Sequence, residues 1–186
     1  MEHLKTLISK QVVISESDLQ TVISKFRIKE LKKGQLLLKR AQIAGQYYYI
    51  NSGALRFYYG DEPQLTAWVV LPGEFFAEIS SLNPQQPTRF NVEAVEATEL
   101  FCIDKADMEL LYQQLPAWQE FGRKTWEAMA IRMIDEIIRF QTLSAEERYL
   151  EFLRKPGFMQ HVTVKQLASY LGITPNALSR IRKNLR

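Results

Sequence analysis

Five side chains with groups suited to nucleic acids lie close together near the C-terminal end of the chain. They are Asn176, Ser179, Arg180, Arg182 and Lys183. Guanidinium and amide groups form paired hydrogen bonds with base edges in the major groove of DNA, whereas ammonium and hydroxyl groups suit phosphate oxygens. This combination predicts contact with double-stranded DNA. In the alternative interpretation, these residues form only the solvated face of an amphipathic helix.

Two short helices joined by a turn must position these side chains. Thr163 and Gln166 have the spacing of a capping box, which predicts the start of the first helix. Gly172 suits a turn with positive φ, and Thr174 followed by Pro175 predicts the start of the second helix. The apolar positions expected where the two helices cross are Val164, Leu167, Ala168, Leu171, Ile173, Leu178 and Ile181. The stretch therefore predicts a helix-turn-helix.

Positive charge is concentrated at the same end of the chain. Residues 144–186 contain eight Lys or Arg residues and three acidic residues, a local net charge of +5 in a chain with an overall charge of +3. From Phe152 onward the sequence has no acidic residue. This asymmetry favours a polyanionic partner for the C-terminal segment.

The preceding part of the chain shows two kinds of sequence pattern, one helical and one β-rich. Short N-terminal helices are predicted before residue 27, and residues 27–103 form short β-rich runs separated by turn residues such as Lys33-Gly34 and Pro72-Gly73. Many short strands without intervening helices are typical of an antiparallel barrel or jelly roll. We therefore expect a barrel with its helices over residues 1–115.

A long helix is predicted from Pro116 to about Leu143. The helix-turn-helix segment follows over residues 144–186, and within it Lys155-Pro156-Gly157 interrupts the helical pattern. Apolar residues alternate at spacings of four and three along this helix, as in a two-stranded coiled coil. These residues are Trp126, Ala130, Met133, Ile137 and Phe140, and Ile131, Ile134 and Ile138 widen the stripe. The stripe predicts a homodimer. Alternatively, it only covers the barrel.

Composition limits the chemistry of the chain. Cys102 is the only cysteine, which excludes an internal disulfide and any site built from several thiolates of one chain. No segment approaches the roughly 20 apolar residues that span a bilayer. We expect a cytoplasmic protein with no membrane contact, no metal site and no cofactor.

The order of these elements resembles the Crp/Fnr (catabolite activator and fumarate-nitrate regulator) family of bacterial transcription factors. The sequence marks are Lys33-Gly34 before QLLLK, YYYINSGALRFYY, PGEFFAEIS, EAVEATELFCI and LASYLGI followed by LSRIRK. The resemblance covers nearly the whole chain. It implies an α+β fold with N-terminal helices, an antiparallel jelly roll of the cyclic-nucleotide-binding type, a long dimerisation helix and a C-terminal helix-turn-helix. It also implies promoter DNA, a second copy and RNA polymerase as candidate partners.

The resemblance places a ligand pocket around Glu78, Ser80, Thr88 and Arg89. Members that bind cyclic nucleotides have a Gly-Glu pair and an arginine ten residues after the glutamate. Here Ala77 replaces the glycine, Thr88 stands at the arginine position, and Arg89 comes one residue late. Because side chains alternate along a strand, Arg89 should face away from the pocket unless a bulge in residues 83–87 restores it. We predict that cyclic AMP is not bound in the family's usual way.

The family's other sensors are not expected here. An iron–sulfur member needs several cysteines, and a haem member needs axial ligands from the sensor domain. His3 and His161 are the only histidines, and both lie outside the predicted barrel. We therefore interpret them as ordinary surface residues and Cys102 as a small buried apolar residue.

The second helix departs from the best-known family pattern, which has Arg and Glu early and a second Arg later. Pro175 and Asn176 occupy the early positions, and Arg180 keeps the late one. Arg180 is the candidate for a guanine contact and Asn176 for an adenine contact. Phosphate contacts are expected from Thr174, Arg182 and Lys183. Since the sequence given stops at Arg186, we expect no β-hairpin wing.

Two functions from other classes are weighed against DNA-binding regulation. A jelly-roll enzyme with a metal centre would need histidines among its strands, and residues 27–103 contain none. We therefore predict that the protein is not an enzyme. A small-molecule binding or protein-interaction module with an inactive helix-turn-helix is the second alternative, against which the basic residues of the second helix argue.

Overall fold

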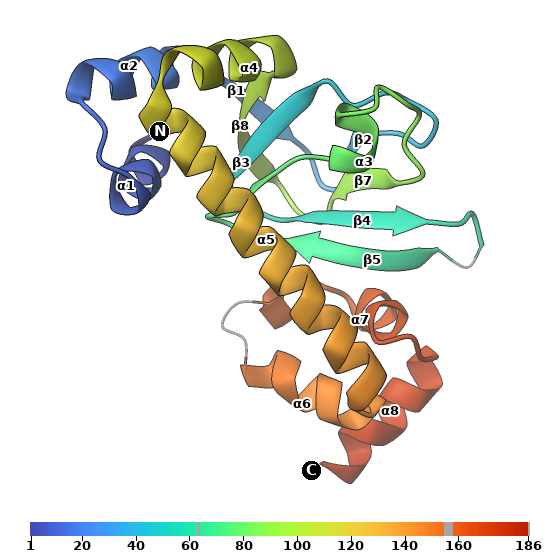
Figure 1. The fold of residues 1–186 in the computed structure, drawn as a ribbon. Helices are drawn as coiled ribbons and strands as arrows, with labels where there is room; N and C mark the ends of the chain where they lie inside the picture. Colours follow the sequence, from blue (N-terminus) through green and yellow to red (C-terminus); the bar gives the residue numbers. More distant parts are fainter. Residues whose placement is uncertain (63, 155–157, 186) are drawn as a thin grey trace.

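A β-barrel, a long helix and a helical C-terminal segment follow one another in the chain (Figure 1). The computed structural model describes residues 1–62, 64–154 and 158–185. The predicted α+β class with an antiparallel jelly roll is confirmed. The predicted break at residues 155–157 lies outside the described residues, as does Arg186.

Two antiparallel four-stranded sheets form the barrel, with strand orders β1-β8-β3-β6 and β2-β7-β4-β5. The strands are β1 (Arg27–Leu31), β2 (Leu36–Leu38), β3 (Gln46–Ser52), β4 (Leu55–Tyr59), β5 (Leu65–Val70), β6 (Phe75–Phe76), β7 (Asn91–Ala94) and β8 (Thr98–Asp104). The order leaves β5 at one edge of the second sheet, next to β4. The C-terminal segment contacts this edge.

Strand β3 is buried on both of its faces, which explains its continuous apolar run. Tyr48 and Ile50 lie in the core between the two sheets, whereas Tyr47 and Tyr49 lie in a second core under the helices. Side chains alternate between the faces of a strand, so consecutive aromatic residues serve both cores. β8 behaves in the same way. The first sheet is therefore the middle layer of this part of the molecule.

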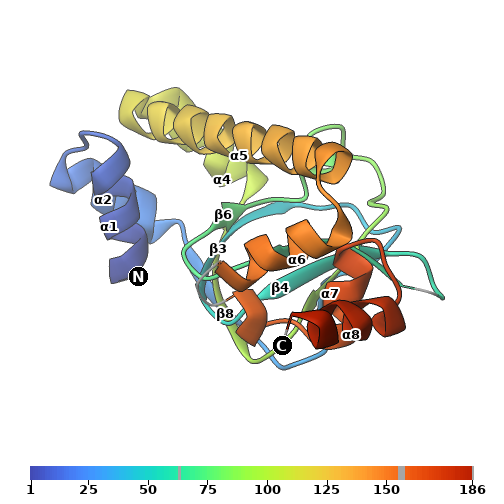
Figure 2. The ribbon, with the colours of Figure 1, turned by 90° about the horizontal axis from the view of Figure 1, so that it is seen from below.

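Helices cover the outer face of this first sheet (Figures 1 and 2). They are α1 (Glu2–Gln11), α2 (Glu16–Ser24), α4 (Lys105–Gln114) and the N-terminal part of α5 (Pro116–Thr142), while α3 (Ile79–Leu82) is a short turn of helix in the barrel. Ser15 caps α2 by accepting a hydrogen bond from the Asp18 N–H at 3.1 Å. Trp118 is completely buried and stacks on Phe121 at a centroid distance of 4.7 Å. These contacts anchor α5 to the barrel at its start.

The C-terminal segment has a core of its own. Its elements are α6 (Ala145–Arg154), the 3-10 turn η1 (Phe158–Gln160), α7 (Val164–Tyr170) and α8 (Pro175–Asn184). The buried residues of this core are Tyr149, Phe152, Leu167, Ala168, Leu171 and Leu178. Helix α5 runs from the N-terminal helices past the barrel to this segment (Figure 1). It thus connects the two parts of the molecule.

Candidate nucleic-acid interface and sensor site

The caps of α7 and α8 form as the sequence predicts. The Thr163 side chain accepts from the Gln166 N–H at 3.2 Å, and the Gln166 side chain accepts from the Thr163 N–H at 2.9 Å. Gly172 has a φ of +72° in the turn between the helices. Thr174 caps α8 by accepting from the Ala177 N–H at 3.2 Å. Each cap hydroxyl thus satisfies one of the backbone donors that a helix start leaves unpaired.

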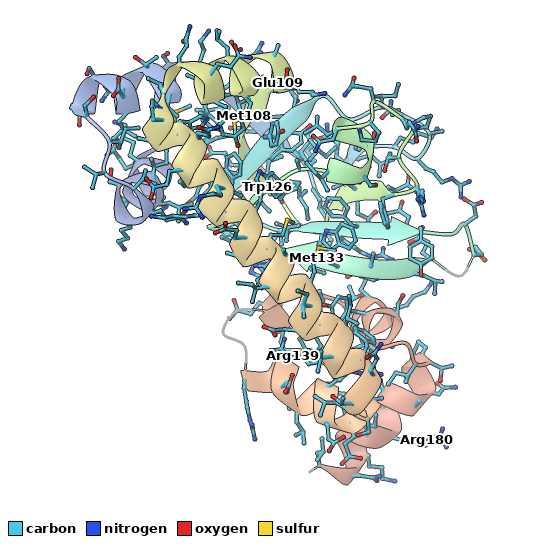
Figure 3. All side chains as sticks on the ribbon, viewed as in Figure 1. Met108, Glu109, Trp126, Met133, Arg139 and Arg180 are labelled. Atoms are coloured by element: carbon cyan, nitrogen blue, oxygen red, sulfur yellow. The ribbon has the colours of Figure 1, made fainter. Side chains whose placement is uncertain are left out.

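Helix α8 has one buried side and one polar, exposed side. Leu178 is completely buried in the C-terminal core, while Arg182 is half-buried. The exposed candidates for DNA contact are Thr174, Asn176, Ser179, Arg180 and Lys183. Figure 3 shows Arg180 at the periphery of the C-terminal helices. The helix therefore presents guanidinium, amide and ammonium groups on a rigidly packed backbone, and their roles at DNA remain predictions.

In the barrel, Glu78 lies at the start of α3 and is 4% exposed. Its Oε1 accepts hydrogen bonds from the Ser80 hydroxyl at 2.6 Å and from the Ser80 N–H at 3.2 Å. Its Oε2 is buried without a partner among the described residues. The carboxylate is thus held mainly by its own helix turn, and one oxygen remains available to a hydrogen-bond donor.

Thr88 and Arg89 lie on different sides of the chain. Thr88 is 3% exposed, and its backbone N–H donates to the Gln42 carbonyl at 2.8 Å while its own carbonyl accepts from the Ala41 N–H at 2.9 Å. Arg89 is exposed. The structure brings Glu78 and Ser80 together, whereas Arg89, within the described part of the chain, makes no hydrogen bond to either of them and is exposed to solvent.

Aromatic rings pack together near this segment. The Trp68 ring stacks on Phe57 at a centroid distance of 4.6 Å and meets Phe90 at 4.9 Å. Phe90 follows Thr88 by two residues and belongs to the edge of the core between the sheets. This part of the barrel is therefore lined by apolar rings, which offer no charge to an anionic group.

The outward face of α5 is apolar. The side chains of Ile131, Met133, Ile134, Ile137 and Ile138 are each at least half exposed. The two ends of the predicted seam pack within the chain, because Trp126 meets Tyr47 at 6.0 Å and Phe140 meets Tyr170 at 6.2 Å. In Figure 3, Trp126 and Met133 mark successive stretches of the helix. The exposed stripe is centred on Ile134.

Other groups that could bind a metal or react lie apart from one another. The residues that the structure describes contain no cluster of three or more His, Cys, Asp or Glu side chains able to hold a metal ion. Cys102 is buried, its Sγ lies 3.3 Å from the Arg27 carbonyl, and burial raises the pKa of its thiol. In the same described part, no helix is both long and apolar enough to cross a membrane.

The barrel matches a known domain. Residues 28–115 match the cyclic nucleotide-binding domain family. This match describes the fold of that part of the chain.

Solved structures share the whole arrangement at low sequence identity. CLP of Xanthomonas campestris is 17% identical, with a TM-score of 0.72 and coverage of 92% of this chain and 91% of that chain. A CooA double mutant from Carboxydothermus hydrogenoformans is 18% identical, with a TM-score of 0.70 and coverage of 89% and 78%. FixK2 of Bradyrhizobium japonicum is 20% identical, with a TM-score of 0.69 and coverage of 86% and 84%. The chain therefore has the Crp/Fnr fold.

Among curated proteins, the chain is similar to a potassium channel protein of Rhodopseudomonas palustris. The two are 24% identical over 104 residues, which cover 56% of this chain. This chain spans about a quarter of the length of that relative. The match covers only part of each protein, so it describes the shared region and not the function of either whole chain.

Ile134 lies at the centre of the exposed stripe, whereas the sequence pattern places it beside the predicted seam. The residues that face the barrel early in α5 are Trp118, Phe121 and Gly122. Since each helical residue advances by 100°, these positions determine which later residues point away from the barrel. Counting from Trp118 and Phe121 would have identified Ile134 as the centre of the exposed stripe.

Proposed function

We propose that the protein is a dimeric regulator of transcription that reads double-stranded DNA with α8. The observation that carries this proposal is the polar, basic face of α8 in a helix-turn-helix whose two helices have side-chain N-caps. Leu167, Leu171 and Leu178 are buried between these helices, whereas Val164, also expected at the crossing, is exposed. CLP, which has the same fold, is described as a global regulator of virulence gene expression. The concentration of positive charge in residues 144–186 supports the same partner.

Most of the polar groups of α8 and its N-cap are assigned a role at DNA. Arg180 donates to a guanine edge and Asn176 pairs with an adenine edge, since their side chains match these patterns of donors and acceptors. Arg182 and Lys183 contact phosphates. The Thr174 hydroxyl accepts from the Ala177 N–H, so its own proton stays available to a phosphate oxygen.

A second copy covers the apolar stripe of α5. Five exposed apolar side chains on one helix face form a larger apolar surface than isolated residues would, and such surfaces mark association sites. A dimer along α5 presents two recognition helices to successive major grooves, about 34 Å apart, on a palindromic site. Two linked contacts also raise the affinity for that site above that of one helix-turn-helix.

DNA binding is tested by selection from duplexes with a randomised centre, followed by gel shift of the recovered site. Arg180→Ala should weaken binding to the recovered site by about 1–3 kcal/mol and relax the sequence preference at one position of each half-site. Arg40→Ala, which removes an exposed arginine from the barrel, is the matched control and should bind like the wild type. Recovery of no duplex at low salt, even with cell extract added, would overturn the proposal and favour a protein-interaction module.

A further inference from the structure

The helix-turn-helix segment is held by the same chain from two sides. Helix α7 lies against β5 of the barrel, and the segment also contacts the last turns of α5 (Figures 1 and 2). Neither contact belongs to the face of α8 proposed for DNA.

On the barrel side, the Ser169 hydroxyl binds the edge of β5. Its Oγ accepts from the Thr66 N–H at 2.8 Å and donates to the Gln64 carbonyl at 3.1 Å. Val69 and Leu71 of the barrel pack against the C-terminal core. Because one hydroxyl binds both a donor and an acceptor of the strand edge, it determines the position of α7 along β5.

The strand that receives Ser169 is itself fixed from behind by a buried arginine. Arg56 is 4% exposed, and its Nε donates to the Thr66 hydroxyl at 2.9 Å. Its Nη1 donates to the Gln64 side chain at 3.1 Å and to Glu93 at 2.9 Å. The same two residues that bind Ser169 are thus tied to β4 and β7. The barrel offers a rigid support rather than a loose strand edge.

On the α5 side, Arg148 joins the end of the long helix to the turn of the helix-turn-helix. Its Nη2 donates to the carbonyl of Leu171, the C-cap residue of α7, at 2.9 Å. Its Nη1 donates to the Phe140 carbonyl at 3.3 Å, and its guanidinium lies 4.3 Å above the Phe140 ring. Tyr170 meets the same ring from α7. A planar group that bonds on both sides and stacks on a ring resists rotation.

We infer that Arg148 and Ser169 are positioning residues that fix α8 relative to α5 and thereby set the half-site spacing that the dimer accepts. The inference rests on the proposed DNA-binding function. Each added base pair moves a half-site along the DNA and around its axis, so two rigidly held recognition helices tolerate few spacings. A loosely held helix-turn-helix would tolerate several. The contacts of Arg148 and Ser169 therefore determine which half-site spacings are bound, although neither side chain contacts a base.

The test measures affinity across a series of palindromes built from the selected site, with the spacing changed one base pair at a time. The wild type should prefer one spacing and bind it about a hundredfold more tightly than an isolated half-site. Arg148→Met and Ser169→Ala should each flatten the spacing preference by about tenfold while leaving the half-site affinity unchanged. A purely structural defect would lower the half-site affinity as well.

Control variants distinguish the loss of the Arg148 and Ser169 contacts from a general loss of stability. Ser169→Thr keeps the hydroxyl and should keep the spacing preference, and Arg40→Met removes an exposed arginine from the barrel and should do the same. If the circular dichroism of Arg148→Met shows that this variant does not fold, the inference is tested with Ser169→Ala alone. Folded variants with the spacing preference of the wild type would overturn this inference and leave the proposed function intact. Failure of the wild type to select any duplex would overturn the proposed function itself.

Discussion

Thr88 and Arg89 are neighbours in the chain, yet Thr88 is buried under the barrel surface and Arg89 is exposed to solvent. The buried position is the one at which family members that bind cyclic nucleotides carry their phosphate-binding arginine. A threonine there supplies a hydroxyl but no positive charge, and Glu78 lies buried nearby in sequence with an unpaired oxygen. A cyclic phosphate entering this site would lack the charge-assisted hydrogen bonds that stabilise it elsewhere.

We expect no measurable binding of cyclic AMP in titration calorimetry. Arg89→Ala should leave the titration unchanged, because this side chain is exposed to solvent, whereas Glu78 and Thr88 are buried. Thr88→Arg, which restores a charge at the buried position, should give the larger heat of the two variants. Micromolar affinity of the wild type that disappears in Arg89→Ala would show that the loop moves Arg89 inward on binding.

The exposed face of α5 predicts which substitution separates the subunits. Ile134→Asp places a charge at the centre of the stripe, and desolvating an unpaired carboxylate between two helices costs several kcal/mol. We expect a dimer mass for the wild type and a monomer mass for this variant in sedimentation analysis. Ile28→Asp, at an equally exposed isoleucine of β1, is the matched control and should remain dimeric. Equal masses for all three proteins would contradict the predicted interface.

Two glycines with similar backbone angles should respond differently to alanine. Gly172 has a φ of +72° and nothing within 4 Å of a Cβ, so Gly172→Ala should lower the unfolding free energy by about 1–2 kcal/mol through backbone strain alone. Gly53 has a φ of +80°, and a Cβ would lie 2.5 Å from the Ala97 carbonyl oxygen. Gly53→Ala should therefore cost more and lower the melting temperature further. Equal shifts in thermal unfolding would contradict this reasoning.

The Cys102 thiol should react slowly in the folded protein. Burial raises its pKa, which keeps the thiol protonated near neutral pH, and only the thiolate attacks disulfide reagents. Ellman's reagent should therefore label native protein slowly and denatured protein fully at about pH 8. Since Cys102 is the only cysteine, the signal has one source. Rapid, complete labelling without denaturant would show that β8 opens readily.

Local signals in the sequence predicted much of this fold. The expected turn at Lys33-Gly34 follows β1 (Arg27–Leu31), and the expected turn at Pro72-Gly73 follows β5 (Leu65–Val70). The caps at Thr163 and Thr174 formed because each depends on atoms within three residues. Helix α3 was not foreseen, since four residues are too few to show helical periodicity. Strand β6 was not predicted either, since two residues are too few to show the alternation of a strand.

Contacts between distant segments were harder to predict. Ser169 lies within a helix whose sequence already explains its apolar positions, so nothing local indicates that its hydroxyl binds Gln64 and Thr66 of the barrel. The sequence indicates Arg148 only as one positive charge of the C-terminal segment. In the structure its guanidinium donates hydrogen bonds to carbonyls of α5 and of the C-cap of α7. Such roles depend on how the elements are placed in space, which short-range periodicity does not contain.

The position of α7 on β5 also covers backbone groups at an edge of the barrel. An edge strand exposes unpaired N–H and C=O groups that invite strands from other molecules, and β5 is such an edge. Ser169 occupies the Thr66 N–H and the Gln64 carbonyl, so the recognition segment shields this edge. A truncated barrel without residues 144–186 would expose it, together with the apolar side chains of Val69 and Leu71. The C-terminal segment thus covers a strand edge of the barrel to which it is attached.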